Sequence, residues 1–184
     1  MATASPSGSE QKLQSTPSGI PQAPFIEDVE SHLGGPDVPV QATLQKFQEA
    51  LQKYKIMESS TFSRSKSLQE KIPDIEKTLA MVEHLKELRE EGKGMETRFE
   101  LHDTLYASAE IEPVDEVNLW LGANVMLSYP LEEAITLLSS KLSTAQKSLK
   151  SADSDLDFLR DQITTMEVNI ARTHNWDVRR RREG

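Results

Sequence analysis

The sequence contains no cysteine, which excludes both a disulfide framework and a zinc site built on cysteine thiolates. Aromatic residues make up only 5% of the 184 residues and hydrophobic residues 36%, whereas charged residues reach 28%. Such a chain has too little apolar surface for one deep core, but enough for narrow helix seams that each bury one stripe. We therefore expect long helices that need partners rather than an ordinary globule.

Positive charge is also scarce, because 21 Lys and Arg residues stand against 30 Asp and Glu residues and the formal net charge is -9. Phosphate binding requires a cationic surface, so no nucleic-acid partner is expected. Residues 1–9 lack the basic and apolar regions of a secretion signal, and no apolar run is long enough to cross a bilayer. Together with the absent cysteine, this predicts a cytoplasmic protein without a membrane partner, and a nuclear role stays open.

Motifs for catalysis and for metal binding are missing as well. The histidines are scattered along the chain, at His32, His84, His102 and His174. They form no His-x-x-x-His pair, and there is no Gly-x-Ser-x-Gly elbow. Gly92-Lys93-Gly94 lacks the spacing of a phosphate loop and is predicted to end a helix. The sequence therefore predicts no enzyme, no cofactor and no metal.

Residues 1–37 are rich in Ser, Pro, Gln and Gly and show no sustained periodicity. A segment of this composition cannot offset its ordering entropy by burial, so we predict that it is mostly disordered. One exception is the stretch from Pro24 to Leu33, which has apolar residues at 25, 26, 29 and 33. This stretch is either two helical turns that dock on a partner or a mildly hydrophobic linker.

A first coiled-coil helix is predicted over residues 38–92, where glycine is absent between Pro39 and Gly92. Its apolar residues alternate at spacings of three and four, which is the heptad pattern of a helix seam. The seam residues are Leu44, Phe47, Leu51 and Tyr54, then Leu68, Ile72, Ile75, Leu79 and Val82. The pattern lapses over Glu58, Thr61 and Ser65, and Pro73 is expected to kink the helix or interrupt its ladder.

A second coiled-coil helix is predicted over residues 130–177, because the heptad register continues from Leu131 to Ile170 without a lapse. Pro130 suits a first helical turn, and the following acidic residues suit the helix dipole. Residues 178–184 are predicted to form a basic tail.

Between the helices, residues 95–129 change to a period of two and are enriched in β-branched and aromatic residues. The predicted strands are Thr97–Leu101, Thr104–Ile111, Val117–Leu121 and Val125–Tyr129, with hairpin turns at His102-Asp103 and Gly122-Ala123-Asn124. The predicted fold class is α+β, a long antiparallel coiled-coil helical hairpin joined by two β-hairpins. A sheet of four short strands leaves unpaired edges, which invite strands from other subunits.

Several stretches together resemble prefoldin, and specifically its α class, whose members carry two hairpins where the β class carries one. The stretches are residues 24–29, 117–127, 155–162, 169–172 and 175–180. The resemblance covers nearly everything from residue 24 onward, and the strand stretch 117–127 is its most specific part. Pro130 is a departure, because related chains more often offer an acidic helix cap there.

The resemblance implies an ATP-independent chaperone subunit in a heterohexamer, with one further α-class and four β-class subunits as partners. It also implies that the complex binds unfolded actin and tubulin and delivers them to the cytosolic ring chaperonin. The alternative is a structural coiled-coil tether or scaffold subunit. The double hairpin distinguishes these functions, because a tether has no need for open strand edges.

Client binding is predicted for apolar residues near the free end of the helical hairpin: Leu44, Phe47, Leu51, Tyr54, Met166, Ile170 and Trp176. The alternative is that these side chains simply close the coil. The predicted assembly platform consists of Phe99, Leu105, Val117, Leu119, Trp120, Leu121, Val125 and Leu127. Contact with chaperonin or another acidic partner is predicted for Arg179, Arg180, Arg181 and Arg182, which form a solvated helix end in the alternative interpretation.

Overall fold

The computed structural model describes residues 19–35 and 38–183 of the chain. These residues form two compact units, and both units contain parts of the two long helices. The coil unit consists of the described residues up to Ser65 and from Ser151 onward, and the hairpin unit consists of residues 66–150. Within the described ranges, no helix has both the length and the apolar character needed to cross a membrane.

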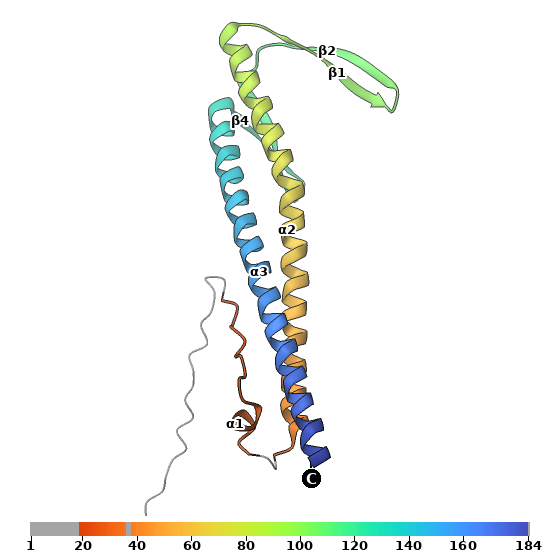
Figure 1. Cartoon of the computed structure of the whole chain (residues 1–184). Coiled ribbons are helices and arrows are strands. Elements are labelled where there is room, and N and C mark those ends of the chain that lie inside the picture. Colours follow the sequence, from red (N-terminus) through yellow and green to blue (C-terminus); the bar gives the residue numbers. More distant parts are fainter. Residues whose placement is uncertain (1–18, 36–37, 184) are drawn as a thin grey trace, which may run out of the picture. The chain divides into compact units, whose positions relative to one another are not determined.

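The long helices are α2 (Val40–Glu91) and α3 (Leu131–Glu183). Inside each unit they lie side by side and run in opposite directions (Figure 1). In the coil unit the Lys55 ammonium lies 3.0 Å from the Glu167 carboxylate. In the hairpin unit Lys86 lies 3.8 Å from Glu132. Because residues late in α2 meet residues early in α3, the predicted antiparallel hairpin of helices is confirmed.

The lapse in the α2 seam is filled by a polar contact. Ser65 is buried although it carries a hydroxyl, and that hydroxyl donates to the Asp153 carboxylate of α3 at 2.8 Å. A buried hydroxyl needs such a partner, since burial without one costs free energy. The helix also continues through Pro73, which cannot donate a ladder bond. The kink expected there stays a prediction.

The hairpin unit carries four strands: β1 (Met95–His102), β2 (Leu105–Ile111), β3 (Glu116–Gly122) and β4 (Val125–Pro130). Gly92 ends α2 with a left-handed φ of 65°, and the Lys93 N–H donates to the Leu88 carbonyl at 3.0 Å. The predicted strand positions hold to within one or two residues at each end. The first turn lies at Asp103 and Thr104, one residue later than predicted, because His102 still pairs with Leu105.

The expectation of one four-stranded sheet is wrong. Strands β1 and β2 form one antiparallel sheet and β3 and β4 a second, with no ladder between the two in the described part of the chain. The start of β3 is instead tied to the start of α3, since the Leu131 N–H donates to the Asp115 carbonyl at 3.2 Å. Figure 1 shows the β1–β2 hairpin projecting from the end of α2. Each hairpin therefore exposes its own strand edges.

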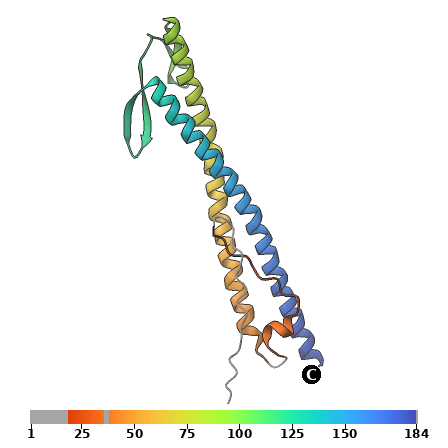
Figure 2. The same ribbon diagram turned by 90° about the vertical axis from the view of Figure 1, so that its left-hand side faces the viewer.

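The expectation that residues 1–37 are mostly disordered is wrong for residues 19–35, which pack on the coil unit; residues 1–18 and 36–37 lie outside the described residues. Figure 2 shows this part of the chain lying over the pair formed by α2 and α3. Among residues 19–35 only α1 (Val29–Leu33) is helical, so the helix is five residues long rather than the two turns considered for residues 24–33. The chain before α1 is extended (Figure 2). Pro21 and Pro24 favour that extended chain, because proline restricts both itself and the residue before it.

Asp28 caps the N-terminus of α1 in an extended conformation. The Ser31 hydroxyl and the Glu30 N–H both donate to its carboxylate, and these bonds hold the pKa of Asp28 below its usual value. At the other end, Gly34 adopts a left-handed φ of 84° and its N–H donates to the Glu30 carbonyl at 3.1 Å. Both ends of this short helix are thus terminated by local bonds.

The predicted boundary between the second helix and a basic tail at residue 178 is also wrong, because α3 continues to Glu183. Asp177 accepts hydrogen bonds from Arg180 and Arg181, which lie three and four residues further along the same helix. Cations in the last turn also interact favourably with the helix dipole. The arginines therefore extend the helix rather than follow it.

Candidate functional site

The residues predicted to contact a client meet in one apolar cluster of the coil unit. Of the predicted residues, Phe47, Tyr54 and Met166 are buried in this cluster. The remaining four predicted residues pack against it and stay partly exposed: Leu44, Leu51, Ile170 and Trp176. Their proximity is thus a finding, and their role in client binding stays a prediction. Phe47 is more enclosed than its place near the end of the helices suggested, with 8% of its surface exposed.

The same cluster contains residues from the N-terminal part of the chain. We call Gly19–Leu33 the docking segment. Its buried side chains repeat at every third position as far as Val29, and they are Ile20, Ala23, Ile26 and Val29, followed by Leu33. An extended chain with about three residues per turn presents every third side chain to the same side. The docking segment thereby covers the apolar cluster along one edge.

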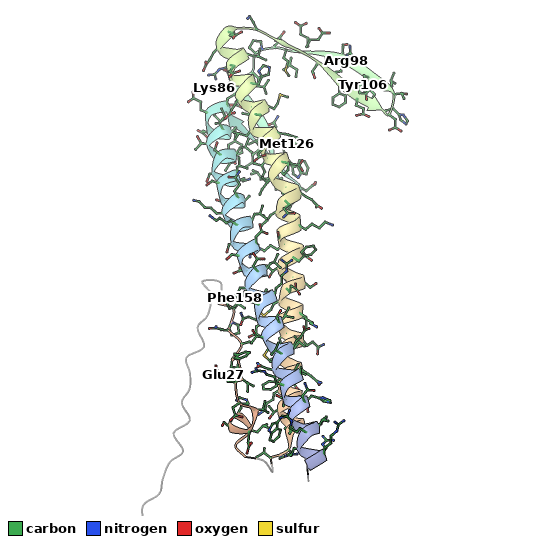
Figure 3. The ribbon with its side chains drawn as sticks, in the orientation of Figure 1. Glu27, Lys86, Arg98, Tyr106, Met126 and Phe158 are labelled. Atoms are coloured by element: carbon green, nitrogen blue, oxygen red, sulfur yellow. The ribbon has the colours of Figure 1, made fainter. Side chains whose placement is uncertain are left out.

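Polar side chains of the helices bind the main chain of the docking segment. Asn169 is fully buried; its amide donates to the Pro24 carbonyl at 2.7 Å, and its carbonyl accepts the Ile26 N–H at 3.1 Å. Gln162 accepts the Ala23 N–H at 2.8 Å. We call Gln162, Asn169 and Arg172 the main-chain stripe of α3. Figure 3 shows the segment, labelled at Glu27, running alongside α3, labelled at Phe158.

Two further side chains complete these contacts. The guanidinium of Arg172 donates to the Ile26 carbonyl at 2.9 Å and lies 4.9 Å from the centre of the Phe25 ring. The Tyr54 hydroxyl donates to the Pro21 carbonyl at 3.0 Å. Burial raises the pKa of Tyr54, because the charged phenolate is poorly solvated there. The neutral, donating form of Tyr54 is therefore the form that the structure favours.

Sequence reasoning missed the main-chain stripe, although a signal was present. Gln162, Asn169 and Trp176 are spaced by seven residues, so they share one heptad position beside the apolar seam. Two amides at that position form a polar line next to a continuous apolar one. Such a line suggests a polar partner along the helix, but it does not say which part of the chain supplies that partner.

The arginines at the end of α3 have different environments. Arg180 pairs with Asp177 and lies 5.1 Å from the centre of the Trp176 ring, and Arg181 pairs with the same carboxylate. Arg179, Arg181 and Arg182 are exposed, and Arg180 is partly buried. A contact with an acidic partner stays a prediction, for which the three exposed arginines are the more accessible part.

The predicted platform residues separate into two groups in the hairpin unit. Leu119 is buried and Val117 partly buried, and both pack with Leu131 and Leu138 of α3. The others are exposed: Phe99, Leu105, Trp120, Leu121, Val125 and Leu127. Three further exposed apolar residues of the strands were not among the predicted platform residues: Leu101, Tyr106 and Met126. Figure 3 shows the last two on the two hairpins. In the described part of the chain these exposed side chains belong to neither apolar cluster, so the hairpins offer apolar surface to other molecules.

Comparison with known proteins gives consistent matches. The family model described as "Prefoldin: Prefoldin subunit" matches residues 54–176. A protein named "Prefoldin subunit 3" from Elsinoe fawcettii is 53% identical over 167 residues, covering 91% of this chain and 84% of its own. The Homo sapiens protein named "Prefoldin subunit 3" is 49% identical over 164 residues, covering 89% of this chain and 83% of its own.

Two further matches extend this pattern. A Schizosaccharomyces pombe protein named "Probable prefoldin subunit 3" is 52% identical over 164 residues, covering 89% of this chain and 94% of its own. Among solved structures, a chain of filamentous PFD from Methanocaldococcus jannaschii, determined by cryo-EM, is similar with a TM-score of 0.52 at 18% identity. That likeness covers 66% of this chain and 98% of the other, and it supports the fold.

Proposed function

This chain belongs to the prefoldin family, and we propose that it holds unfolded polypeptides on the coil unit without using ATP. It is a chaperone subunit of a prefoldin complex and not an enzyme. The proposal concerns where on this chain a polypeptide binds and what happens to it afterwards.

The observation that carries the proposal is the apolar cluster shared by α2 and α3 in the coil unit. Some of its members stay partly exposed at the cluster edge, among them Leu51 and Ile170. When an unfolded chain lies on this edge, the apolar surface that is still exposed is removed from water, and this burial favours binding. Each contact is weak, so several subunits acting together supply the affinity.

The partners include other prefoldin subunits. We further propose the arrangement that the family resemblance implies, with one further α-class subunit and four β-class subunits. The exposed hairpin side chains support this arrangement, because they offer apolar surface and open strand edges to neighbouring subunits. Actin and tubulin chains as clients, the cytosolic ring chaperonin as recipient, and a cytoplasmic and nuclear location belong to the same proposal.

The test compares two double variants in the assembled complex. Leu51→Ser with Ile170→Ser removes apolar side chains from the cluster edge, which costs roughly 1 kcal/mol for each partly buried side chain. Phe62→Ser with Val168→Ser is the matched control, because these side chains are exposed on the same two helices outside the cluster. We expect the first variant alone to lose suppression of the aggregation of an unfolded protein.

Native mass spectrometry of the same samples shows whether each complex has kept its subunits. An intact complex that holds no unfolded protein, in the wild type as well as in the variants, would contradict the proposal and favour the structural tether. Equal loss in both double variants would show that the cluster edge is not the binding surface.

A further inference from the structure

The main-chain stripe and the docking segment match in length along α3. Gln162 and Asn169 are one heptad apart, and they bind the N–H groups of Ala23 and Ile26, which are three residues apart. One heptad of an α-helix rises about 10.5 Å. Three residues of extended chain span about 9 to 10 Å. An extended chain can therefore repeat its contacts with the stripe once per heptad.

The contacts of the stripe select backbone geometry rather than side-chain identity. Asn169 offers both a donor and an acceptor to the chain beside it, and the hydrogen bonds between the stripe and the docking segment all go to main-chain atoms of the segment. At Pro21 and Pro24 the helices bind only the main-chain carbonyl of the segment. Proline lacks a main-chain N–H, but no hydrogen bond to the helices is lost at these positions. The requirements are an extended conformation and an apolar side chain at every third position.

We propose that this surface is a binding site for the main chain of an extended polypeptide, and that the docking segment occupies it as a competitor carried by the same chain. The ligand is a stretch of unfolded protein that is extended, tolerates proline and carries an apolar residue at every third position. This inference rests on the proposed function, because it states how an unfolded client is recognised and what it displaces.

The way the docking segment is held suits displacement. Apart from α1 the docking segment contains no helix or hairpin. Side chains between its buried positions, such as Gln22 and Phe25, are exposed. Gly34 and Gly35, with φ of 84° and 139°, follow the segment, and glycine adopts such angles at little cost. A covered site lowers the apparent affinity for a ligand in proportion to the fraction of time that it is open.

The first test releases the segment without altering the helices. Ile20→Ser with Ile26→Ser removes two buried apolar contacts of the segment, and Gln22→Ser is the control at an exposed position. The assembled complex is titrated with fluorescently labelled, reduced and carboxymethylated α-lactalbumin, which stays unfolded. We expect the double variant to bind about tenfold more tightly, as for a site covered about 90% of the time. The control should bind like the wild type.

Adding Asn169→Ala to the released variant tests the stripe. Alanine keeps the helix propensity but removes both main-chain bonds, so binding should weaken by about tenfold relative to the released variant. A synthetic peptide of residues 19–33 should also displace the probe from the released complex. The same peptide with serine at positions 20 and 26 should not displace it. This competition keeps the test valid if the Asn169 variant fails to assemble.

Hydrogen exchange of the wild-type complex provides the last measurement. The amides of Ala23 and Ile26 should be protected in the free complex and exchange faster with the probe bound, while the amides of α3 stay protected. If the wild type binds the probe but these amides stay protected and the released variant gains no affinity, the segment is a permanent part of the coil and the inference is wrong. If no variant binds the probe, the proposed function fails with it.

Discussion

At the scale of single residues, the coil unit is distinguished by polar side chains at buried positions. Asn169, Gln162, Ser65 and Thr173 are all buried, and each has a hydrogen-bond partner. Among the described residues, no buried side-chain nitrogen or oxygen lacks a partner. A buried polar group without a partner costs about 1 to 3 kcal/mol, so these residues require the chain segments that satisfy them. The partners of Asn169 and Gln162 lie in the docking segment, and Ser65 of α2 pairs with Asp153 of α3, whereas Thr173 is satisfied within its own helix.

Replacing Tyr54 by Phe should weaken docking of the segment by about 1 kcal/mol, because the change removes the hydroxyl that donates to the Pro21 carbonyl. Burial raises the pKa of Tyr54, so its contribution is complete below the ordinary tyrosine pKa of about 10 and is lost as the pH rises through the higher folded value. The stability difference between wild type and variant, measured by chemical denaturation, should shrink across that range. Tyr106→Phe, at an exposed position, should show no difference at any pH.

At the scale of elements, the two hairpins differ in their turns. Ala123 and Asn124 both have positive φ, 49° and 63°, which is the geometry of a type I′ turn. Asp103 and Thr104, in the turn between β1 and β2, are not among the residues with positive φ. Alanine carries a Cβ, which glycine lacks, and it cannot form the local hydrogen bonds of an asparagine side chain. The left-handed conformation is therefore strained at position 123.

Changing this turn to the preferred pair, Ala123→Asn with Asn124→Gly, should stabilise the β3–β4 hairpin by about 1 kcal/mol. Slower amide exchange in the paired residues Trp120 and Met126 would report the gain. The same pair placed in the other turn, Asp103→Asn with Thr104→Gly, is the control and should not stabilise β1–β2. Equal gains in both hairpins would show that turn geometry is not the cause.

Packing in the hairpin unit predicts unequal costs for two leucines of α3. Leu138 is buried in a cluster with Leu119 and Leu131, whereas Leu142 is partly exposed and lies outside that cluster. Leu138→Ala should lower the free energy of unfolding by about 2 to 5 kcal/mol, since it leaves a cavity. Leu142→Ala should cost clearly less, because water already reaches that position. Denaturation curves of the two variants make the comparison, and equal costs would contradict this account of the cluster.

At the scale of the whole molecule, the exposed apolar residues of the hairpins predict how the chain behaves alone. Phe99 and Trp120 are 64% and 59% exposed, so they contribute little to the fold of the isolated subunit. We expect Phe99→Ser with Trp120→Ser to keep the helix content measured by circular dichroism but to lose assembly with other prefoldin subunits in native mass spectrometry. The isolated wild-type chain should self-associate, and a monodisperse wild-type monomer at micromolar concentration would contradict the assembly role of these residues.

Local periodicity was sufficient to predict the long helices and the positions of the strands, whereas the family resemblance rests on particular stretches such as residues 117–127. Heptad spacing from Leu131 to Ile170 and the alternation from Val117 to Leu127 are properties of neighbouring residues. The partners of those elements were less predictable. Leu119 and Trp120 are adjacent in one strand, yet one is buried against α3 and the other is exposed, as expected for side chains on opposite faces. Their alternation alone did not show which face meets the helices.

The sequence by itself determined the helical seams and the hairpins, because both depend on patterns that repeat over a few residues, and its particular stretches carried the resemblance to prefoldin. Only the tertiary structure decided that the docking segment lies on the coil and that two separate hairpins replace one sheet. The contacts of the segment join residues far apart in the chain, such as Ala23 with Gln162 and Ile26 with Asn169, at separations of 139 and 143 positions. A short segment rich in proline acquires its order from those distant side chains, which satisfy its main chain and bury its apolar residues.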